Sequence, residues 1–316
     1  MTDRSAPLVP APDNETLTAV LGVRVGHWHD AVARTGCTVI LLPDAGAVTS
    51  GLILGPSPGS RESALLSPEK TVDLVHALVL TGGSAFGLAA ADGVMRWLEA
   101  RGVGYVTPGG IVPIVPAAVI YDLTSGNASV RPTAADGETA AARASADPVE
   151  EGAVGAGTGA MVGKIAGFEG AQRSGLGSAL MRVRGALVGV IAISNAVGDI
   201  VDPATGTIVA GCGLGTDPEA VLAQFAPPIG VNTTLVAVVT DAPLTKAQAN
   251  ALSLSAHIGI ARVTRPSHTV FDGDTAYVAT TALGPLVELG ALSVAVQEVV
   301  ARALLRGVRA VQAPSQ

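Results

Sequence analysis

The chain has 316 residues, of which 48% are hydrophobic and only 14% are charged, so it can bury a sizeable core. Its formal net charge is −7 and no run of lysine or arginine occurs, which argues against nucleic acid or an anionic membrane as a partner. The two cysteines, Cys37 and Cys212, lie far apart, which argues against a disulfide framework and fits a reducing cytoplasm.

The chain order predicts a loose, proline-rich arm over residues 1–20 and then one layered α/β domain over residues 21–316. Short apolar runs bounded by turn residues predict buried strands at 38–42, 77–80, 187–193, 235–239 and 276–280. Helices are predicted over residues 85–100, after a capping box formed by Thr245 and Gln248, and over 286–305, ending before Gly307. The longest uncharged stretch, 102–121, is broken by proline and glycine and cannot form a regular membrane-spanning helix.

Polar residues stand at the ends of three of the predicted strands. Asn232-Thr233-Thr234 comes directly before the run 235–239, Asn195 ends the run 187–193, and Asp272-Gly273-Asp274 precedes the run 276–280. Taken singly, these are ordinary strand starts and turns. A buried carboxylate, however, needs a partner, and so the three sites together suggest a polar cluster at the strand ends.

Two further segments carry candidate polar residues. Lys164 follows a glycine-rich segment with little other charge, which suggests a partly buried lysine, although an ordinary surface lysine fits about equally well. His27 and His29 could suggest a metal site, but no further ligands stand at metal-binding spacing, so we expect structural histidines and no bound metal.

The segment TGGSAFG around Ser84 offers a different nucleophile. His257 and His268 lie downstream of Ser84 in the order of an α/β-hydrolase triad, but the GxSxG pattern would need glycine where Phe86 stands. This serine-hydrolase alternative is therefore weak.

Six segments in order resemble the L-aminopeptidase/D-esterase family, whose relatives include β-aminopeptidases and 6-aminohexanoate-oligomer (nylon oligomer) hydrolases. The resemblance runs from about Leu21 to the C-terminal helix, and the ordered set is more specific than any one piece. The segments are GVRVGH, TGGSAFGLAAADGVMRWL, GAVGAGTGAMVGK, ISNAVGD, NTTLVAVVTDAPLT and FDGDTAYVATT.

The resemblance implies an αββα sandwich and a self-cleaving hydrolase with an N-terminal nucleophile. The bond cut would be Asn232–Thr233, which leaves fragments 1–232 and 233–316. Thr233 would then carry both a hydroxyl and a free α-amine, whose ordinary pKa of about 7.7–8 lets it act as the base for its own hydroxyl. The resemblance further implies no cofactor and a homo-oligomer of cleaved protomers, with a tetramer favoured.

Five further residues match functional positions of the family. Asn195 matches an asparagine that positions the oxyanion, and Tyr121, in VIYDL, matches a tyrosine placed near it. Lys164 matches a lysine whose charge would favour the neutral amine and balance the aspartates. We expect one of the two aspartates, Asp272 and Asp274, to orient the nucleophile, and the second aspartate to orient that first aspartate.

A threonine nucleophile with an Asp-Gly-Asp pattern agrees with the nylon-oligomer branch, since the aminopeptidases commonly use serine and Ser-Gly-Asp/Glu patterns. We therefore predict an amidohydrolase that cleaves small linear amides through an acyl-enzyme on Thr233. The nearest alternative is an aminopeptidase that releases N-terminal L- or β-amino acids. An acyltransferase with the same nucleophile remains open, as do an uncut binding protein of the same fold and an uncut hydrolase that uses Ser84.

Overall fold

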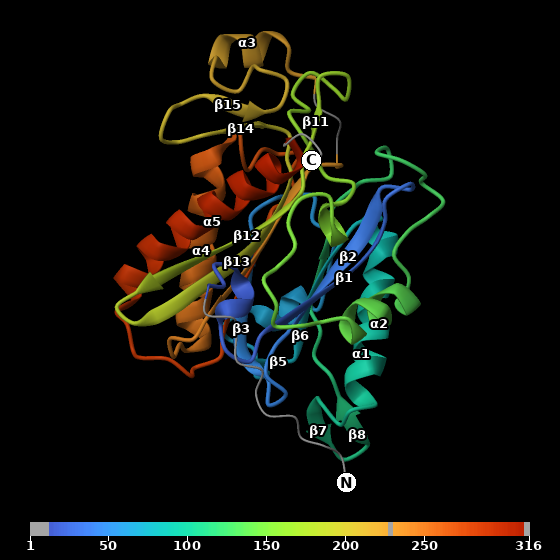
Figure 1. Cartoon of the computed structure of the whole chain (residues 1–316), viewed down its shortest axis with the longest axis vertical. Coiled ribbons are helices and arrows are strands. Elements are labelled where there is room, and N and C mark those ends of the chain that lie inside the picture. Colours follow the sequence, from blue (N-terminus) through green and yellow to red (C-terminus); the bar gives the residue numbers. More distant parts are fainter. Residues whose placement is uncertain (1–12, 227–229, 313–316) are drawn as a thin grey trace.

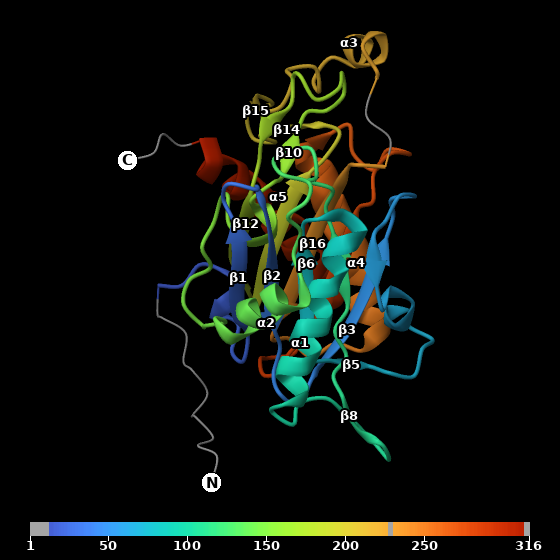
Figure 2. The ribbon, with the colours of Figure 1, turned by 90° about the vertical axis from the view of Figure 1, so that its right-hand side faces the viewer.

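Two β-sheets stack face to face and helices cover both outer faces, which gives the predicted αββα sandwich (Figures 1 and 2). The structure is a computed structural model that describes residues 13–226 and 230–312. The fold class predicted from the sequence is confirmed.

The first sheet has five strands and the second has six. In spatial order, the strands of the first sheet are β1 (Arg24–Asp30), β2 (Thr35–Leu41), β6 (Ala77–Thr81), β9 (Ala117–Val119) and β4 (Ser60–Arg61). Those of the second sheet are β12 (Leu176–Val183), β13 (Ala186–Asn195), β16 (Thr233–Thr240), β18 (Thr275–Thr280), β3 (Ala47–Ile53) and β5 (Leu74–Val75). All five strands predicted from the sequence lie in these two sheets.

Smaller sheets and the helices complete the described part of the chain. The short strands are β7 (Tyr105–Thr107), β8 (Gly110–Val112), β10 (Met161–Val162), β11 (Gln172–Arg173), β14 (Asp199–Val201), β15 (Ile208–Ala210) and β17 (Thr264–Arg265). The α-helices are α1 (Ala90–Glu99), α2 (Ala134–Ala142), α3 (Pro218–Ala223), α4 (Lys246–Val263) and α5 (Leu289–Gln312). The 3₁₀ turns are η1 (Leu17–Ala19), η2 (Ser63–Leu66), η3 (Ser84–Ala89) and η4 (Gly155–Gly157). None of the helices described is long and apolar enough to cross a membrane.

Side chains that alternate in direction along each strand explain how one strand contributes to two layers of the core. In β16, Val236 and Val238 pack toward α4 and α5, whereas Leu235, Ala237 and Val239 pack between the two sheets. Successive strand residues point to opposite faces, so a continuous apolar run is what a strand buried on both faces requires. In Figure 1, α4 and α5 lie side by side over the second sheet, while α1 and α2 lie over the first.

The C-terminal helix extends beyond its predicted end because Gly307 allows close packing and does not end the helix. Helix α5 begins at Leu289 and continues past Gly307 to Gln312. Gly307 faces Gly177 of β12, where an added Cβ would lie 2.0 Å from the Ala303 carbonyl oxygen. The two glycines let the helix and strand backbones approach closely, so the sequence signal for a helix end was wrong here.

The other helix predictions hold in part. The capping box of Thr245 and Gln248 is present at the start of α4. The helix expected over 85–100 begins as the 3₁₀ turn η3 and becomes α-helical only at Ala90.

The predicted boundary between arm and domain at residue 21 lies too late in the chain. Residues 1–12 lie outside the described part, but Leu17 is fully buried between the sheets, and its backbone N–H donates to Ser178 Oγ at 2.9 Å. Asn14 is also buried and donates to Thr18 Oγ1 at 2.9 Å. Residues 14–20 therefore belong to the folded domain.

Candidate active site

The polar residues singled out at three strand ends meet at one edge of the second sheet. Asn195, at the end of β13, pairs directly with Thr233, the first residue of the antiparallel strand β16. On the other side of β16, strand β18 runs parallel to it, with Leu235 opposite Thr275. Because parallel neighbours start at the same edge, Asp272 and Asp274 lie beside the start of β16.

The bond between Asn232 and Thr233 is surrounded by hydrogen-bond donors. The Thr233 hydroxyl, in a residue only 5% exposed, donates to the Asn232 carbonyl oxygen at 2.6 Å. The Gly273 backbone N–H donates to the same oxygen at 2.8 Å. The hydroxyl therefore lies next to the carbonyl group that it would have to attack, and that carbonyl is already polarised.

Lys164 lies buried beneath this junction and holds Asn195. Its ammonium donates to the Asn195 backbone oxygen at 2.8 Å, to Asn195 Oδ1 at 3.1 Å and to the Val231 carbonyl at 3.3 Å. The Asn195 amide Nδ2 in turn donates to the Val231 carbonyl at 3.1 Å and to the Tyr121 carbonyl at 3.2 Å. The sequence leaves a partly buried lysine and a surface lysine open, and the structure shows a buried one, since Lys164 is 1% exposed.

The charge of Lys164 is set by opposing effects. Burial lowers its pKa from 10.5 to about 7, although the charges of Asp272 and Asp274 act to raise it. All three ammonium hydrogens face carbonyl oxygens, an arrangement that favours the charged form. A buried lysine whose pKa is lowered toward neutrality is typical of catalytic sites.

The two aspartates are held in different ways. Asp274 accepts the Thr234 backbone N–H on Oδ1 at 2.5 Å, and its Oδ2 lies 2.8 Å from His268 Nδ1. Asp272 accepts both the backbone N–H and the hydroxyl of Thr269 on Oδ2, each at 2.7 Å. Burial, together with the charge of Asp274, raises the pKa of Asp272 to about 6.

Tyr121 reaches the cluster through its backbone only. Its carbonyl accepts from the Asn195 amide, and no hydrogen bond of its hydroxyl occurs within the described ranges. The sequence-based role for the Tyr121 side chain near the oxyanion thus stays a prediction.

Two residues of the cluster escaped the sequence reasoning. The sequence indicates only a turn at Gly273, yet the Gly273 N–H donates to the Asn232 carbonyl. The chain order suggests only Ser84 as a partner for His268, yet His268 is paired with Asp274. The Asp272-Gly273-Asp274 motif could have pointed to Gly273, whereas nothing in the sequence links residue 268 to residue 274 beyond their nearness.

The serine-hydrolase alternative finds little support in this geometry. Ser84 begins η3, and its backbone N–H bonds to the Ile120 carbonyl. His257 faces the Leu52 carbonyl at 3.0 Å and His268 faces Asp274, so neither ring is hydrogen-bonded to Ser84 in the part of the chain that the structure describes.

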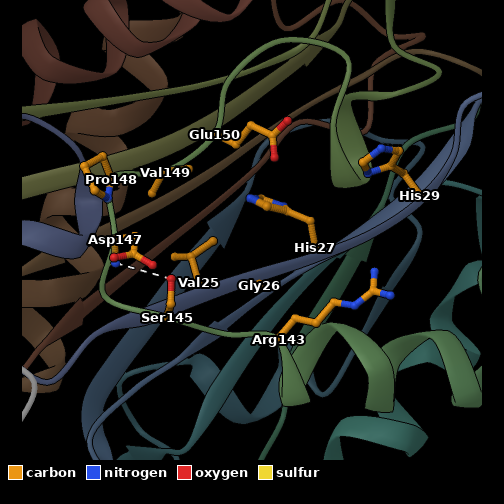
Figure 3. Close-up of a pocket in the computed structure, with 10 residues that line it drawn as sticks. All are labelled: Val25, Gly26, His27, His29, Arg143, Ser145, Asp147, Pro148, Val149 and Glu150. Carbon is orange, nitrogen blue, oxygen red and sulfur yellow. Dashed lines mark hydrogen bonds between the residues drawn. The ribbon is translucent and has the colours of Figure 1, made fainter.

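His27 and His29 lie elsewhere, in a pocket of about 310 Å³ beside β1 (Figure 3). His27 Nδ1 lies 3.0 Å from the Thr38 hydroxyl, and burial, with the neighbouring charge of His29, lowers the pKa of His27 to about 4. None of the residues drawn in Figure 3 belongs to the cluster around Thr233. No group of three His, Cys, Asp or Glu side chains suited to a metal ion occurs in residues 13–226 and 230–312.

Comparison with known proteins places this cluster in a family. The model of peptidase family S58 matches residues 15–314, which is nearly the whole chain. The chain belongs to peptidase family S58. S58 is the family of the L-aminopeptidase/D-esterase and β-aminopeptidases, so the resemblance drawn from the six sequence segments is confirmed, and the chain is a hydrolase of amide or peptide bonds.

Curated relatives of this S58 protein carry two kinds of name. Proteins called uncharacterized aminopeptidases in Mycobacterium tuberculosis and Mycobacterium bovis are each 41% identical over 93% of both chains. The 6-aminohexanoate-oligomer endohydrolase of Paenarthrobacter ureafaciens is 32% identical over 82% of this chain and 73% of that protein.

Solved S58 structures share the fold at low identity. The L-aminopeptidase D-Ala-esterase/amidase of Ochrobactrum anthropi, described as a variant of the Ntn hydrolase fold, matches with a TM-score of 0.73 at 20% identity. A β-aminopeptidase of Burkholderia sp. matches with a TM-score of 0.72 at 22% identity. Each match covers 96% of this chain and 88% of the other.

Proposed function

We propose that this S58 hydrolase cuts its own chain between Asn232 and Thr233 and then uses Thr233 as an N-terminal nucleophile on linear amides. The observation that carries the proposal is the pair of donors on the Asn232 carbonyl oxygen, the Thr233 hydroxyl at 2.6 Å and the Gly273 N–H at 2.8 Å. Denaturing mass spectrometry of the purified protein tests it: fragments 1–232 and 233–316 are expected, and a single intact chain from folded protein would refute the proposal.

Self-cleavage would proceed through an ester. Thr233 Oγ attacks the Asn232 carbonyl carbon, the C–N bond breaks, and the hydroxyl proton passes to the Thr233 nitrogen, which becomes an amine. Water then hydrolyses the ester to an Asn232 carboxylate and a free Thr233 hydroxyl. The Gly273 N–H lies at the distance expected of a donor to the oxyanion formed in this step.

Proton transfer before cleavage needs a base other than the α-amine, since the Thr233 nitrogen is still an amide. Asp272, with a pKa raised to about 6, is a neighbouring carboxylate that can accept this proton, and Lys164, with a pKa lowered to about 7, is a neighbouring group that also titrates near neutrality. Both lie in the cluster at the start of β16, so the uncut chain already holds acid–base groups.

After cleavage, the Thr233 amine would serve as the base for its own hydroxyl when a substrate amide is attacked. The Asn195 amide now donates to the Val231 carbonyl, directly before the cut site. Departure of the new chain end would release this donor for the oxyanion of the substrate, which is the role that the family resemblance implies for Asn195.

The substrate class that we favour is a linear oligoamide of the 6-aminohexanoate type. Thr233 with Asp272 and Asp274 supports this choice, as do the relatives named 6-aminohexanoate-oligomer endohydrolases at 32% identity. The relatives named aminopeptidases, at 41% identity, favour a second candidate, release of N-terminal L- or β-amino acids.

Rates on a 6-aminohexanoate oligomer with a free and with an acetylated N-terminus would separate these two functions. An endohydrolase is expected to cut both forms at comparable rates. An aminopeptidase needs the substrate ammonium and should lose activity on the acetylated form. An added amine acceptor in the same assay would expose acyl transfer, because the acyl group would then appear on the acceptor.

We also propose that the cleaved protomers assemble into a homo-oligomer, with a tetramer as the favoured state. The support is the family resemblance and the low fraction of charged residues, 14%. Light scattering coupled to size-exclusion chromatography measures the mass in solution directly, and a mass of one protomer would contradict this assembly.

The Gly273→Ala substitution is expected to slow self-cleavage by about 100-fold. A Cβ at residue 273 would lie 2.8 Å from Thr233 Oγ1 and 2.5 Å from the Ser57 carbonyl oxygen, too close for either contact. The nucleophile or the Gly273 N–H must then shift, and displacements of about 1 Å in reacting groups cost rates of this order. The fraction of uncut chain, followed by denaturing electrophoresis after synthesis in vitro, gives the rate.

Gly290→Ala is the matched control for this substitution. Gly290 lies at the start of α5, and a Cβ there would meet no atom within 4 Å. That variant should cut at the parent rate, since alanine suits a helix better than glycine does. Equal cutting of the Gly273→Ala chain and the parent would remove Gly273 from the reaction.

A further inference from the structure

His268 is a partly buried histidine whose two ring nitrogens both face acceptors. It lies in the loop that joins β17 to β18, with φ of 52°. Its Nδ1 lies 2.8 Å from Asp274 Oδ2, and its Nε2 lies 3.0 Å from the His257 carbonyl oxygen. The side chain is 21% exposed, whereas that of Asp274 is 2% exposed.

Only the doubly protonated ring satisfies both contacts. A neutral imidazole carries one N–H, so one of its nitrogens would point a lone pair at an acceptor. With the proton on Nε2, the Nδ1 lone pair would face the Asp274 carboxylate; with the proton on Nδ1, the Nε2 lone pair would face the His257 carbonyl. An imidazolium donates from Nε2 to the His257 carbonyl and places its positive charge against the Asp274 carboxylate, 2.8 Å from Nδ1, so the surroundings select the charged form.

The charges around the ring act in the same direction. Burial works to lower the pKa of His268, but the hydrogen bond and charge of Asp274 outweigh it, and the pKa is raised above its ordinary value. Asp272 adds to this effect from the same loop. The neighbouring His257, whose ring centre lies 5.0 Å away, has its pKa lowered by burial and so stays neutral.

We propose that His268 is a positioning residue that, as an imidazolium, holds the Asp274 carboxylate directed at the start of β16. Asp274 Oδ1 accepts the Thr234 N–H, one residue from the nucleophile, while His268 occupies the other oxygen. The inference rests on the proposed function of Thr233 and deepens it. Lys164 and His268 then supply two cations against the two carboxylates of Asp272 and Asp274.

The consequence for the chemistry is a lower pKa of the Thr233 α-ammonium. A positive charge nearby disfavours a second one, so the imidazolium would help to keep the amine neutral and able to act as a base. Removal of the imidazolium leaves an excess of negative charge, which stabilises the ammonium form. Activity, which rises as the amine loses its proton, should then need a higher pH.

The test is the pH dependence of kcat/KM for a His268→Asn variant. The substrate is a 6-aminohexanoate oligomer or an amino-acid 4-nitroanilide, depending on which of the two the parent protein cleaves. Asparagine tolerates the left-handed backbone at residue 268 and keeps an N–H donor near the position of Nδ1, but it carries no charge. We expect the acid limb, which reports the free enzyme's base, to move to higher pH by about one unit. A purely structural role would lower activity without moving the limb.

His29→Asn is the matched control, because it removes an exposed histidine on β1 that lies outside the cluster. The acid limb of its kcat/KM profile against pH should superimpose on that of the parent. A His268→Asn limb that also superimposes on the parent would overturn the role of His268, while cutting of the parent at Asn232–Thr233 would leave the proposed function intact. An uncut parent would instead overturn the proposed function.

Nitrogen NMR of a Thr233→Ala chain reads the protonation of His268 without any need for catalysis or for a folded His268→Asn variant. His268 should have both ring nitrogens protonated at pH 7, whereas His27 and His257 should be neutral. Assignment follows from asparagine variants at the other four positions. A neutral His268 ring at pH 7 would overturn the proposal.

Discussion

A Thr233→Ala chain is expected to remain in one piece, while the parent chain is recovered as fragments 1–232 and 233–316. The substitution removes the hydroxyl that lies 2.6 Å from the Asn232 carbonyl oxygen and leaves no group in its place. Loss of a catalytic nucleophile typically lowers kcat by a factor on the order of 10⁶. Intact mass under denaturing conditions checks the cut, and amide hydrolysis by the same samples should be lost with it.

Two neighbouring substitutions sharpen this result. Thr233→Ser keeps a hydroxyl and should still cut, because the attacking oxygen is preserved. Thr234→Val removes the next hydroxyl along β16 at nearly constant volume and should cut like the parent. Cutting of the Thr233→Ala chain at the same bond would exclude Thr233 as the nucleophile, and a simultaneous loss of activity in a Ser84→Ala chain would then favour Ser84.

The second large effect is expected from Lys164→Met, which should slow self-cleavage and amide hydrolysis by about 100-fold or more. The substitution removes the cation that holds the Asn195 backbone and amide oxygens and balances the two aspartates. Electrostatic groups of this kind typically contribute 10²–10³ in kcat. The uncut fraction after synthesis, together with kcat on the substrate identified for the parent, measures the loss.

The chain offers a closely matched control in Lys246, a second buried lysine. Its ammonium also faces three carbonyls, those of Leu65, Lys70 and Val72, at 2.8–3.0 Å. It begins α4, beyond the end of β16 opposite to Thr233.

Lys246→Met should therefore lower the free energy of unfolding by roughly 1–3 kcal/mol, since its buried carbonyls lose their donor, but should leave cutting intact. Equal loss of cutting in both lysine variants would mean that Lys164 acts through general stability and has no role of its own in the reaction.

The candidate site could be predicted from the sequence where a polar residue interrupts an apolar run. Asn195, Thr233 and the aspartates at 272 and 274 all stand at strand ends, and a strand end is where a sheet presents side chains to a site. Gly307 shows the limit of such local signals. The sequence predicts a helix end there, but Gly307 is an interior residue of α5 that allows contact with Gly177 on β12.

His268 shows the same limit within the site. The neighbouring residues in the sequence do not indicate which group His268 contacts. The order of residues along the chain suggests only Ser84 as a partner. The turn before β18 brings the ring to Asp274, six residues later, and to the His257 carbonyl in the second half of α4. Both contacts depend on how the loop folds back, and a pattern of residue types does not encode that.

The sequence by itself determined the layered fold, because strands that are buried on both faces require continuous apolar runs. It also determined the family, because six motifs follow one another in the order that is typical of that family. It also marked Thr233 and most of the residues around it. Only the tertiary structure decided which groups touch. The pairing of β13 with β16 and the parallel start of β18 bring Lys164 to Asn195, Gly273 to the Asn232 carbonyl and His268 to Asp274. Such contacts arise from distances across the sheet that spacing along the chain leaves open.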